Sequence, residues 1–328
     1  MCYFLNGVHM LKKLIYISLF LFGIILLIGC NYLENQNVRK VGMLIESSLH
    51  NHPWEERGYD GLLAIRDQYD VDIYLKEKVK SEHEIVNAVD ELVKSGVTLI
   101  FGHGNIYGRY FADIASNYPD IHFVYFNGGY YADNVTSLNF DSHAMGFFSG
   151  MIAGKMTDTK QIGILAAHEW QPEIEGFYEG VKYEDPSIVV HINFINDWNE
   201  VDIAIDMYER MKRNQVDVVY PAGELFSDVI LERVVADNNY GIGYGADQSY
   251  IDSEAILTST IQHVDKLYML AAEKVMNQSL DGGILFFDFQ DEVISLGKYS
   301  PDIPLDFQEA VNDLIDHYKK TNLLPNEQ

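Results

Sequence analysis

Residues 41–75 read VGMLIESSLHNHPWEERGYDGLLAIRDQYDVDIYL, and this stretch determines the fold class. It opens on the apolar run Val41–Ile45, which is typical of a buried parallel strand. Apolar residues at helical spacing follow over Tyr59–Tyr69, and Val71–Leu75 is a second run that predicts a strand. Strand, helix and strand in this order predict a parallel βαβ unit.

The same alternation continues through the chain. Further strands are predicted at 97–101, 122–126 and 135–140, with a capping box at Ser81–Glu84 that predicts the start of a helix. A second series of strands follows at 161–165, 188–194, 216–220 and 241–245, separated by predicted helices. Two consecutive series of similar size predict an α/β protein with two doubly wound parallel-sheet domains joined by a hinge.

Domain boundaries follow from this pattern. The N-terminal α/β domain is expected to comprise residues 40–140 plus about 261–283, and the C-terminal α/β domain residues 141–260 plus about 284–328. The roughly 290 residues after the N-terminal segment exceed what one hydrophobic core usually organises. The final segments return to strand and helix, so the two domains are expected to interleave near the end of the chain.

The N-terminal segment predicts export and anchoring. Lys12 and Lys13 precede an apolar run from Leu14 to Ile28, which has the length of a signal-peptide core, and Gly29-Cys30 closes it. This ending resembles the lipobox of bacterial lipoproteins, so we expect residues 1–29 to be a signal peptide, Cys30 to be lipidated and residues 30–39 to be a tether. An uncleaved membrane anchor is the alternative. Either way, positive charges before the apolar run place residues 31–328 on the extracytoplasmic face of the cell membrane. Met1 and Met10 both remain possible starts.

Charge and cysteine content exclude several classes of function. The chain carries a net charge of −26, and removal of residues 1–29 takes away two lysines and no acid, which leaves −28. Such an acidic protein is not expected to bind nucleic acid, since that interaction needs basic surface. Cys2 and Cys30 are the two cysteines in the chain, so the mature protein has no disulfide and no cysteine-ligated metal.

Polar and aromatic residues follow several of the predicted strands. In doubly wound sheets ligands bind beyond the carboxyl ends of the strands, so these residues are candidates for a site that binds a small organic ligand. Trp54 and Phe226 are expected to stack on a ring of that ligand. The polar candidates are Glu46, Glu55, His103, Asn127, Glu224 and Asp247.

Other chemistries are less well supported by the sequence. His50 and His52, with His103, Glu46 and Glu55 on neighbouring loops, are an alternative metal site, but zinc needs ligands that converge. Gly241–Gly245 contains spaced glycines but lies within a predicted strand, which is the wrong context for a dinucleotide loop. We expect no metal, no cofactor and no enzymatic activity.

The loops and strands together resemble a known family. The motifs that carry the resemblance run from about Val41 to about Leu324: GMLI at 42–45, GYDGL at 58–62, IFGHG at 100–104, FFSGMIAG at 147–154, VDVV at 216–219, DQ at 247–248 and LTST at 257–260. In this order they are similar to the basic membrane protein family, lipoprotein receptors typified by the purine-nucleoside-binding components of ABC importers. The resemblance implies a fold like that of type I periplasmic binding proteins, a nucleoside as ligand and an ABC permease as partner.

Within that family the chain is most similar to the Med-type branch. The similarity rests on GHG at 102–104, WQPE at 170–173, YPAG at 220–223 and FDFQD at 287–291. That branch is described as a positive effector of competence gene expression. The resemblance therefore implies an alternative function, a regulatory lipoprotein on the same fold.

Four positions depart from the pattern of the family. Glu55 replaces an asparagine, Gly245 replaces an acid that would bind ribose hydroxyls, Gln262 replaces a lysine and Asn127 stands where many members have aspartate. Loss of such groups typically removes discrimination for a polar ligand. The fold is expected to survive these changes, whereas nucleoside specificity is open.

Overall fold

The computed structural model describes residues 38–327. The predicted signal segment, Cys30 and most of the tether lie outside the described residues. Between residues 38 and 327, no helix is both long enough and apolar enough to cross a bilayer.

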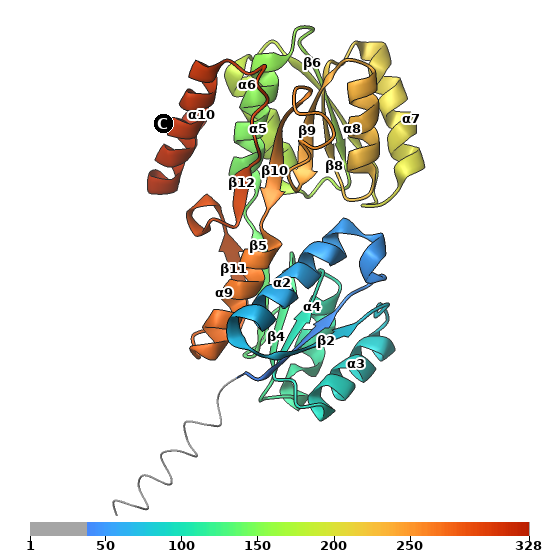
Figure 1. Ribbon diagram of the computed structural model, residues 1–328, viewed down its shortest axis with the longest axis vertical. Coiled ribbons are helices and arrows are strands. Elements are labelled where there is room, and N and C mark those ends of the chain that lie inside the picture. Colours follow the sequence, from blue (N-terminus) through green and yellow to red (C-terminus); the bar gives the residue numbers. More distant parts are fainter. Residues whose placement is uncertain (1–37, 328) are drawn as a thin grey trace, which may run out of the picture.

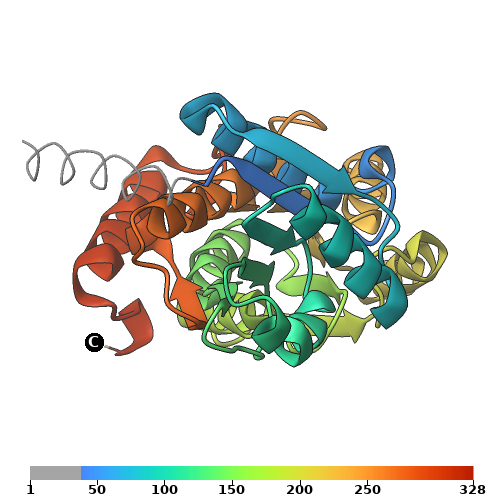
Figure 2. The same ribbon diagram turned by 90° about the horizontal axis from the view of Figure 1, so that it is seen from below.

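The first lobe is built on a six-stranded parallel sheet with the strand order β11-β5-β4-β3-β1-β2. Its helices α2 and α9 pack side by side on one face (Figures 1 and 2), while α3 and α4 contribute to a separate apolar cluster on the other. The strands are β1 (Lys40–Leu44), β2 (Asp72–Lys76), β3 (Leu99–Gly102), β4 (His122–Phe126), β5 (Val135–Phe140) and β11 (Gly283–Phe287). The helices are α2 (Pro53–Tyr69), α3 (Glu82–Lys94), α4 (Tyr107–Ile114) and α9 (Val264–Met276).

The second lobe repeats this arrangement in the order β12-β10-β9-β8-β6-β7 (Figure 1). All its neighbouring strands run parallel except β12, which is antiparallel to β10. Its strands are β6 (Gln161–Ala166), β7 (Val189–Phe194), β8 (Val218–Ala222), β9 (Tyr240–Gly245), β10 (Ile256–Gln262) and β12 (Ile294–Leu296). The remaining helices are α5 (His143–Met156), α6 (Pro172–Glu184), α7 (Val201–Met211), α8 (Phe226–Ala236) and α10 (Leu305–Thr321). The expected fold class, α/β with two doubly wound sheets, is confirmed.

The chain passes between the lobes three times within residues 38–327. The passages follow β5, β10 and β11, so each lobe contains segments from distant parts of the sequence (Figure 1). The expected boundary at residues 283 and 284 is wrong, because Ile284 to Phe287 pair with Ser137 to Phe140 in the first sheet. Here β11 covers what would otherwise be the open edge of β5.

Local signals explain where several elements begin. Ser81 accepts a hydrogen bond from the backbone N–H of Glu84 and the Glu84 carboxylate accepts one from the N–H of Ser81, so the predicted capping box is confirmed. Pro53 occupies the first turn of α2, where its missing N–H costs nothing. As a result, α2 begins six residues before the predicted helix at Tyr59 and includes Trp54 and Glu55.

Helices α5 and α6 pack against one another through glycines. A β-carbon at Gly150 of α5 would lie 2.1 Å from the carbonyl oxygen of Phe177, and one at Gly180 of α6 would lie 1.9 Å from that of Phe147. Gly146 and Gly176 approach the partner helix equally closely. The two backbones therefore touch directly, and no side chain larger than hydrogen fits between them.

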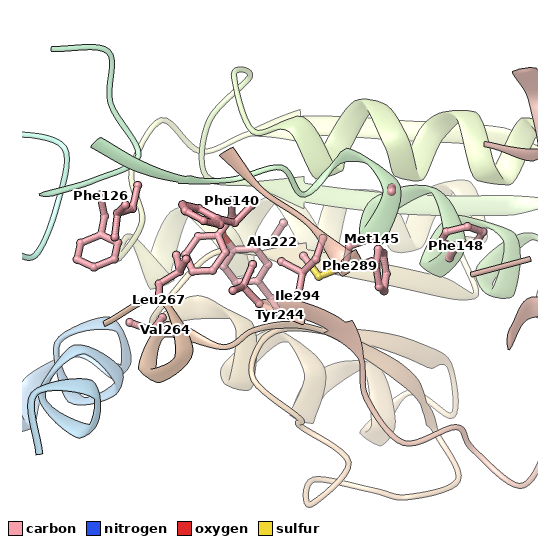
Figure 3. Packing of buried hydrophobic residues seen from close by; sticks show 14 of the residues in the cluster. Phe126, Phe140, Met145, Phe148, Ala222, Tyr244, Val264, Leu267, Phe289 and Ile294 are labelled. Carbon is pink, nitrogen blue, oxygen red and sulfur yellow. The ribbon is translucent and has the colours of Figure 1, made fainter. Parts of the chain in front are cut away.

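The main apolar core is continuous across both lobes. Figure 3 shows Phe126 and Phe140 from the first sheet in the same cluster as Ala222 and Tyr244 from the second. Val264 and Leu267 of α9 belong to it as well. This shared core fixes the edges of the two sheets close to each other at the passages between the lobes.

Candidate ligand cleft

A cavity of about 380 Å³ lies between the lobes. It is lined by the segments that follow β1, β3 and β4 in the first lobe and β6, β7 and β8 in the second, together with Tyr244 of β9. In each sheet the strand order reverses between the first strand and the third, and ligands of doubly wound sheets bind at this point. The topology thus places the points at which the strand order reverses in the two sheets on one cleft.

Five of the eight predicted ligand-binding residues line this cleft: Glu46, Trp54, Glu55, Asn127 and Glu224. The first four come from the first lobe and Glu224 comes from the second. Asn127 has a backbone φ of 56°, a left-handed conformation that asparagine adopts more readily than most residues. The prediction that these loops converge agrees with the geometry, while ligand binding itself remains a prediction.

His103 lies behind the cleft wall and not in it. Its ring is buried and stacks on Trp54, with ring centroids 4.3 Å apart and planes at 13°. Nε2 lies 2.7 Å from the carbonyl oxygen of Trp54 and Nδ1 lies 3.0 Å from the hydroxyl of Tyr268. Burial lowers the pKa of His103 to about 3, so the imidazole is neutral at physiological pH. His103 therefore holds Trp54 in place.

Phe226 does not line the cleft, which corrects the expectation that it stacks on a ligand. It is the first residue of α8 and is fully buried in the core that α8 forms with α7. A β-carbon at Gly223 would lie 2.0 Å from Cζ of Phe226, so its ring lies directly against the Gly223 backbone. The sequence predicts a helix over Asp228–Asp237, whereas α8 begins two residues earlier, and this turns the ring inward.

Asp247 also lies outside the cleft. It lines a separate hollow of about 390 Å³ on the second lobe, together with Tyr250 and Lys298. Its carboxylate accepts a hydrogen bond from the N–H of Ser249 at 3.1 Å. This contact stabilises a local turn and explains the residue without a ligand.

Glu55 is the most unusual carboxylate of the cleft. Its side chain is 4% exposed; Oε1 accepts from the N–H of Ser47 at 3.2 Å, whereas Oε2 is buried without a hydrogen-bond partner. Burial, with smaller contributions from the charges of Glu46 and Glu224, raises its pKa to about 7. Burial also raises the pKa of Glu46, against the opposing charge of Lys80.

Arg57 links the lobes across the cleft. Its guanidinium donates to Oε1 of Glu224 at 2.8 Å, and the side chains are 18% and 10% exposed. A β-carbon at Gly245 would lie 3.1 Å from the same guanidinium nitrogen, and Gly245 has a φ of 76°. A side chain at position 245, such as the acid of the family pattern, would therefore compete with Arg57 for space.

The second lobe contributes an aromatic wall. Trp170 and Trp198 meet edge to face with centroids 5.7 Å apart, and Trp198 stacks at 6.4 Å on Tyr244. Beneath them the buried Glu173 carboxylate accepts hydrogen bonds from Ser142 at 2.7 Å and Gln171 at 3.0 Å. Glu173 is thus satisfied by the protein itself.

Sequence reasoning missed several residues of the cleft. Trp198 lies four residues beyond the predicted strand 188–194, Tyr244 lies within the predicted strand 241–245, and Arg57, which contacts Glu224 beside the cleft, lies within a helix, so the ends of the predicted strands indicate none of the three. Gln262 also lines the cleft, so that with Glu55 and Asn127 three of the four departures from the family pattern lie at the site. Within residues 38–327, no three His, Cys, Asp or Glu side chains are grouped closely enough to hold a metal ion.

Two α/β lobes with a shared, acid-lined and aromatic cleft define the class of solute receptors. The chain belongs to the family described as ABC transporter substrate-binding protein PnrA-like, whose model matches residues 38–323. This is a family of solute-binding proteins and not a class of enzymes.

Individual relatives cover nearly the whole chain. It is 41% identical over 307 residues to the transcriptional activator protein Med of Bacillus subtilis, which spans 93% of this chain and 97% of that protein. It is 22% identical over 314 residues to basic membrane protein A2 of Borrelia garinii, at 90% and 91% coverage. The crystal structure of a transcriptional activator of the comK gene from Bacillus halodurans superposes with a TM-score of 0.83 at 40% identity, covering 87% of this chain and 99% of that one. The resemblance to the basic membrane proteins and their Med-type branch is confirmed.

Proposed function

We propose that this protein binds a small, ring-bearing organic molecule between its lobes, and that this binding stabilises the closed arrangement of the cleft. The observation that carries the proposal is the cleft itself, where Trp54 from one lobe faces the aromatic wall of the other. Its volume of about 380 Å³ suits one small metabolite and is too small for a folded partner.

A nucleoside is the first ligand to test. The family description supports a substrate-binding role and a transporter as partner. Aromatic rings on both walls suit a base, and the carboxylates Glu46 and Glu224 suit hydroxyl or amino groups. The departures at Glu55, Gly245 and Gln262 argue that the preferred compound differs from the one bound by typical members.

Anchoring through Cys30 would hold the receptor at the outer face of the membrane. The apolar run before Cys30, the polar tether after it and the names of the Borrelia relatives support this part of the proposal. Mass spectrometry of the protein from membranes tests it, since lipidation adds mass to the peptide that begins at Cys30. A peptide that retains residues 1–29 argues against it.

The ligand test is a melting-shift screen with nucleosides, bases and related metabolites. A compound that binds the folded state alone raises the melting temperature by mass action. The shift is expected to be lost in Trp54→Ala and kept in Tyr131→Ala, because Tyr131 is an exposed aromatic residue outside the cleft lining. A shift of equal size in both variants would show that the ligand binds elsewhere.

A regulatory role is the second candidate. It is supported by the 41% identity to a protein named as a transcriptional activator and by the 40% identity to a solved activator of comK. A net charge of −26 argues that any effect on transcription is indirect, through a ligand or another protein. Deletion of the gene, complemented with wild type or Trp54→Ala, tests this role. Competence-gene transcription that is unaffected by deletion excludes it.

A further inference from the structure

We propose that the cleft selects ligands that carry a positively charged nitrogen group, such as an ammonium, an amidinium or a protonated heterocycle, and that Glu55 is the carboxylate that receives this group. The inference rests on the proposed function, since it assigns a charge class to the ligand of the same cleft.

The first support is the unfilled hydrogen-bonding capacity of Glu55. Its Oε2 is buried, has no partner among the described residues and belongs to a side chain that lines the cleft. A buried carboxylate oxygen without a donor is costly, and native proteins seldom leave one so. An N–H group of a ligand would supply the missing donor.

The second support is the balance of charge around Glu55. The carboxylates of Glu46 and Glu224 both lie close enough to raise its pKa. The guanidinium of Arg57 binds Glu224 through Nη2, its buried Nε makes no hydrogen bond to Glu55, and exposed Lys80 counters Glu46. Glu55 is therefore left without a cation of its own. The phenols of Tyr107 and Tyr268 are neutral, because burial raises the pKa of each, with smaller contributions from Glu46 and Glu55 at Tyr107 and from Glu55 at Tyr268.

The third support is the aromatic lining. Trp54, Trp198 and Tyr244 all border the cavity, and the faces of such rings attract cations. Trp54 already has the guanidinium carbon of Arg57 5.5 Å from its ring centroid. A cationic ligand that stacks against this lining gains from the rings and from the carboxylates together.

The experiment compares matched compounds that differ in charge. Calorimetric titrations of the full chain in detergent would use tyramine against tyrosol, tryptamine against tryptophol, and 7-methylguanosine against guanosine. The cationic member of at least one pair is expected to bind about 10- to 100-fold more tightly, as a buried hydrogen bond to a charged group implies. The preference is expected to disappear in Glu55→Gln and to persist in Glu56→Gln, an exposed acid on the same helical turn.

The pH dependence gives an independent readout. A cation favours the ionised form of Glu55, so its affinity should rise between pH 6 and 8, with release of a proton on binding. A neutral ligand that accepts a hydrogen bond from protonated Glu55 would show the opposite trend.

The outcomes are distinct. Tighter binding of the neutral members, or a cation preference that survives Glu55→Gln, overturns the inference and leaves the proposed function standing. If no compound of either charge binds while the protein melts cooperatively, the proposed function and the inference both fail.

Discussion

The glycine contact between α5 and α6 is expected to be intolerant of even one methyl group. In Gly150→Ala the new β-carbon would lie 2.1 Å from the carbonyl oxygen of Phe177 and 3.0 Å from its Cα. Carbon and oxygen in contact need roughly 3.3 Å, so the helices must separate by about 1 Å. The obstacle is backbone, so no side-chain rotation can relieve it.

The magnitude follows from two opposing effects. Overpacking of a core costs about 1–3 kcal/mol, and we expect the upper end because backbone meets backbone. Alanine regains about 1 kcal/mol of helix propensity. The net loss is about 2 kcal/mol, which corresponds to a fall in melting temperature of about 4–8 °C for a lobe of this size.

Thermal unfolding followed by circular dichroism measures this loss, and Gly154→Ala is the matched control. Gly154 is on the same helix, but the nearest neighbours of its added β-carbon are Cβ of Glu184 at 3.0 Å and the backbone Cα of Val181 at 3.4 Å, so the contact is about 1 Å looser than the one at Gly150. The control is expected to melt within a few degrees of wild type. If Gly150→Ala melts as high as Gly154→Ala, the close approach of the two helix backbones does not limit the size of residue 150.

Three further outcomes are expected. The first is a double-mutant cycle with Arg57→Met and Glu224→Gln, measured as the free energy of unfolding in urea. Each single change should lower this free energy by about 1–3 kcal/mol, and the two effects should not add, because either partner alone is a largely buried charge. Additive effects would mean that the salt bridge is not formed in solution. Because the pKa of Glu55 is raised to about 7, the folded state keeps a proton between pH 4.5 and 7 that the unfolded chain has released, so this residue's contribution to stability falls as pH rises through that window, by about 3 kcal/mol in total. Glu55→Gln should therefore gain stability relative to wild type as the pH is raised. His103 has the opposite trend, since its pKa is lowered to about 3 and its contribution to stability is lost as pH falls below 6.5, but this trend is the same in both proteins and cancels in the comparison. A stability difference that stays constant across pH would contradict the raised pKa of Glu55. Tyr268→Phe should cost about 1 kcal/mol in urea unfolding, since it leaves Nδ1 of buried His103 without its partner, and a stability equal to wild type would show that this bond is weak.

The sequence predicts the two-lobe fold because the signals for parallel strands are local. Runs such as Val41–Ile45 and Phe123–Phe126 are continuous and apolar, and most of the strands are followed by a helical pattern, so the order of elements can be read directly. The position of β11 in the first sheet, by contrast, is not determined by local sequence. Gly283–Phe287 is an apolar strand in either lobe, and only the open edge of β5 determines which sheet receives it.

The cleft is predictable in part for the same reason. Residues directly after a strand, such as Glu46 and Asn127, have their position fixed by the sheet. Residues near a helix start depend on where the helix begins, and a shift of two residues sends Phe226 into the core. Arg57 reaches Glu224 from the other lobe, across a distance of 167 residues in the chain, and no periodicity contains that information.

The three passages between the lobes also set an order of events during synthesis. The first lobe begins at β1, yet its sheet lacks its outer strand until residue 287 of 328 has been made. Helix α9, which packs on α2, arrives nearly as late. The first lobe therefore completes its sheet only shortly before the second, whose last strand β12 ends at Leu296, and both lobes complete their folding within the same late interval, as a chain rich in contacts between distant residues must.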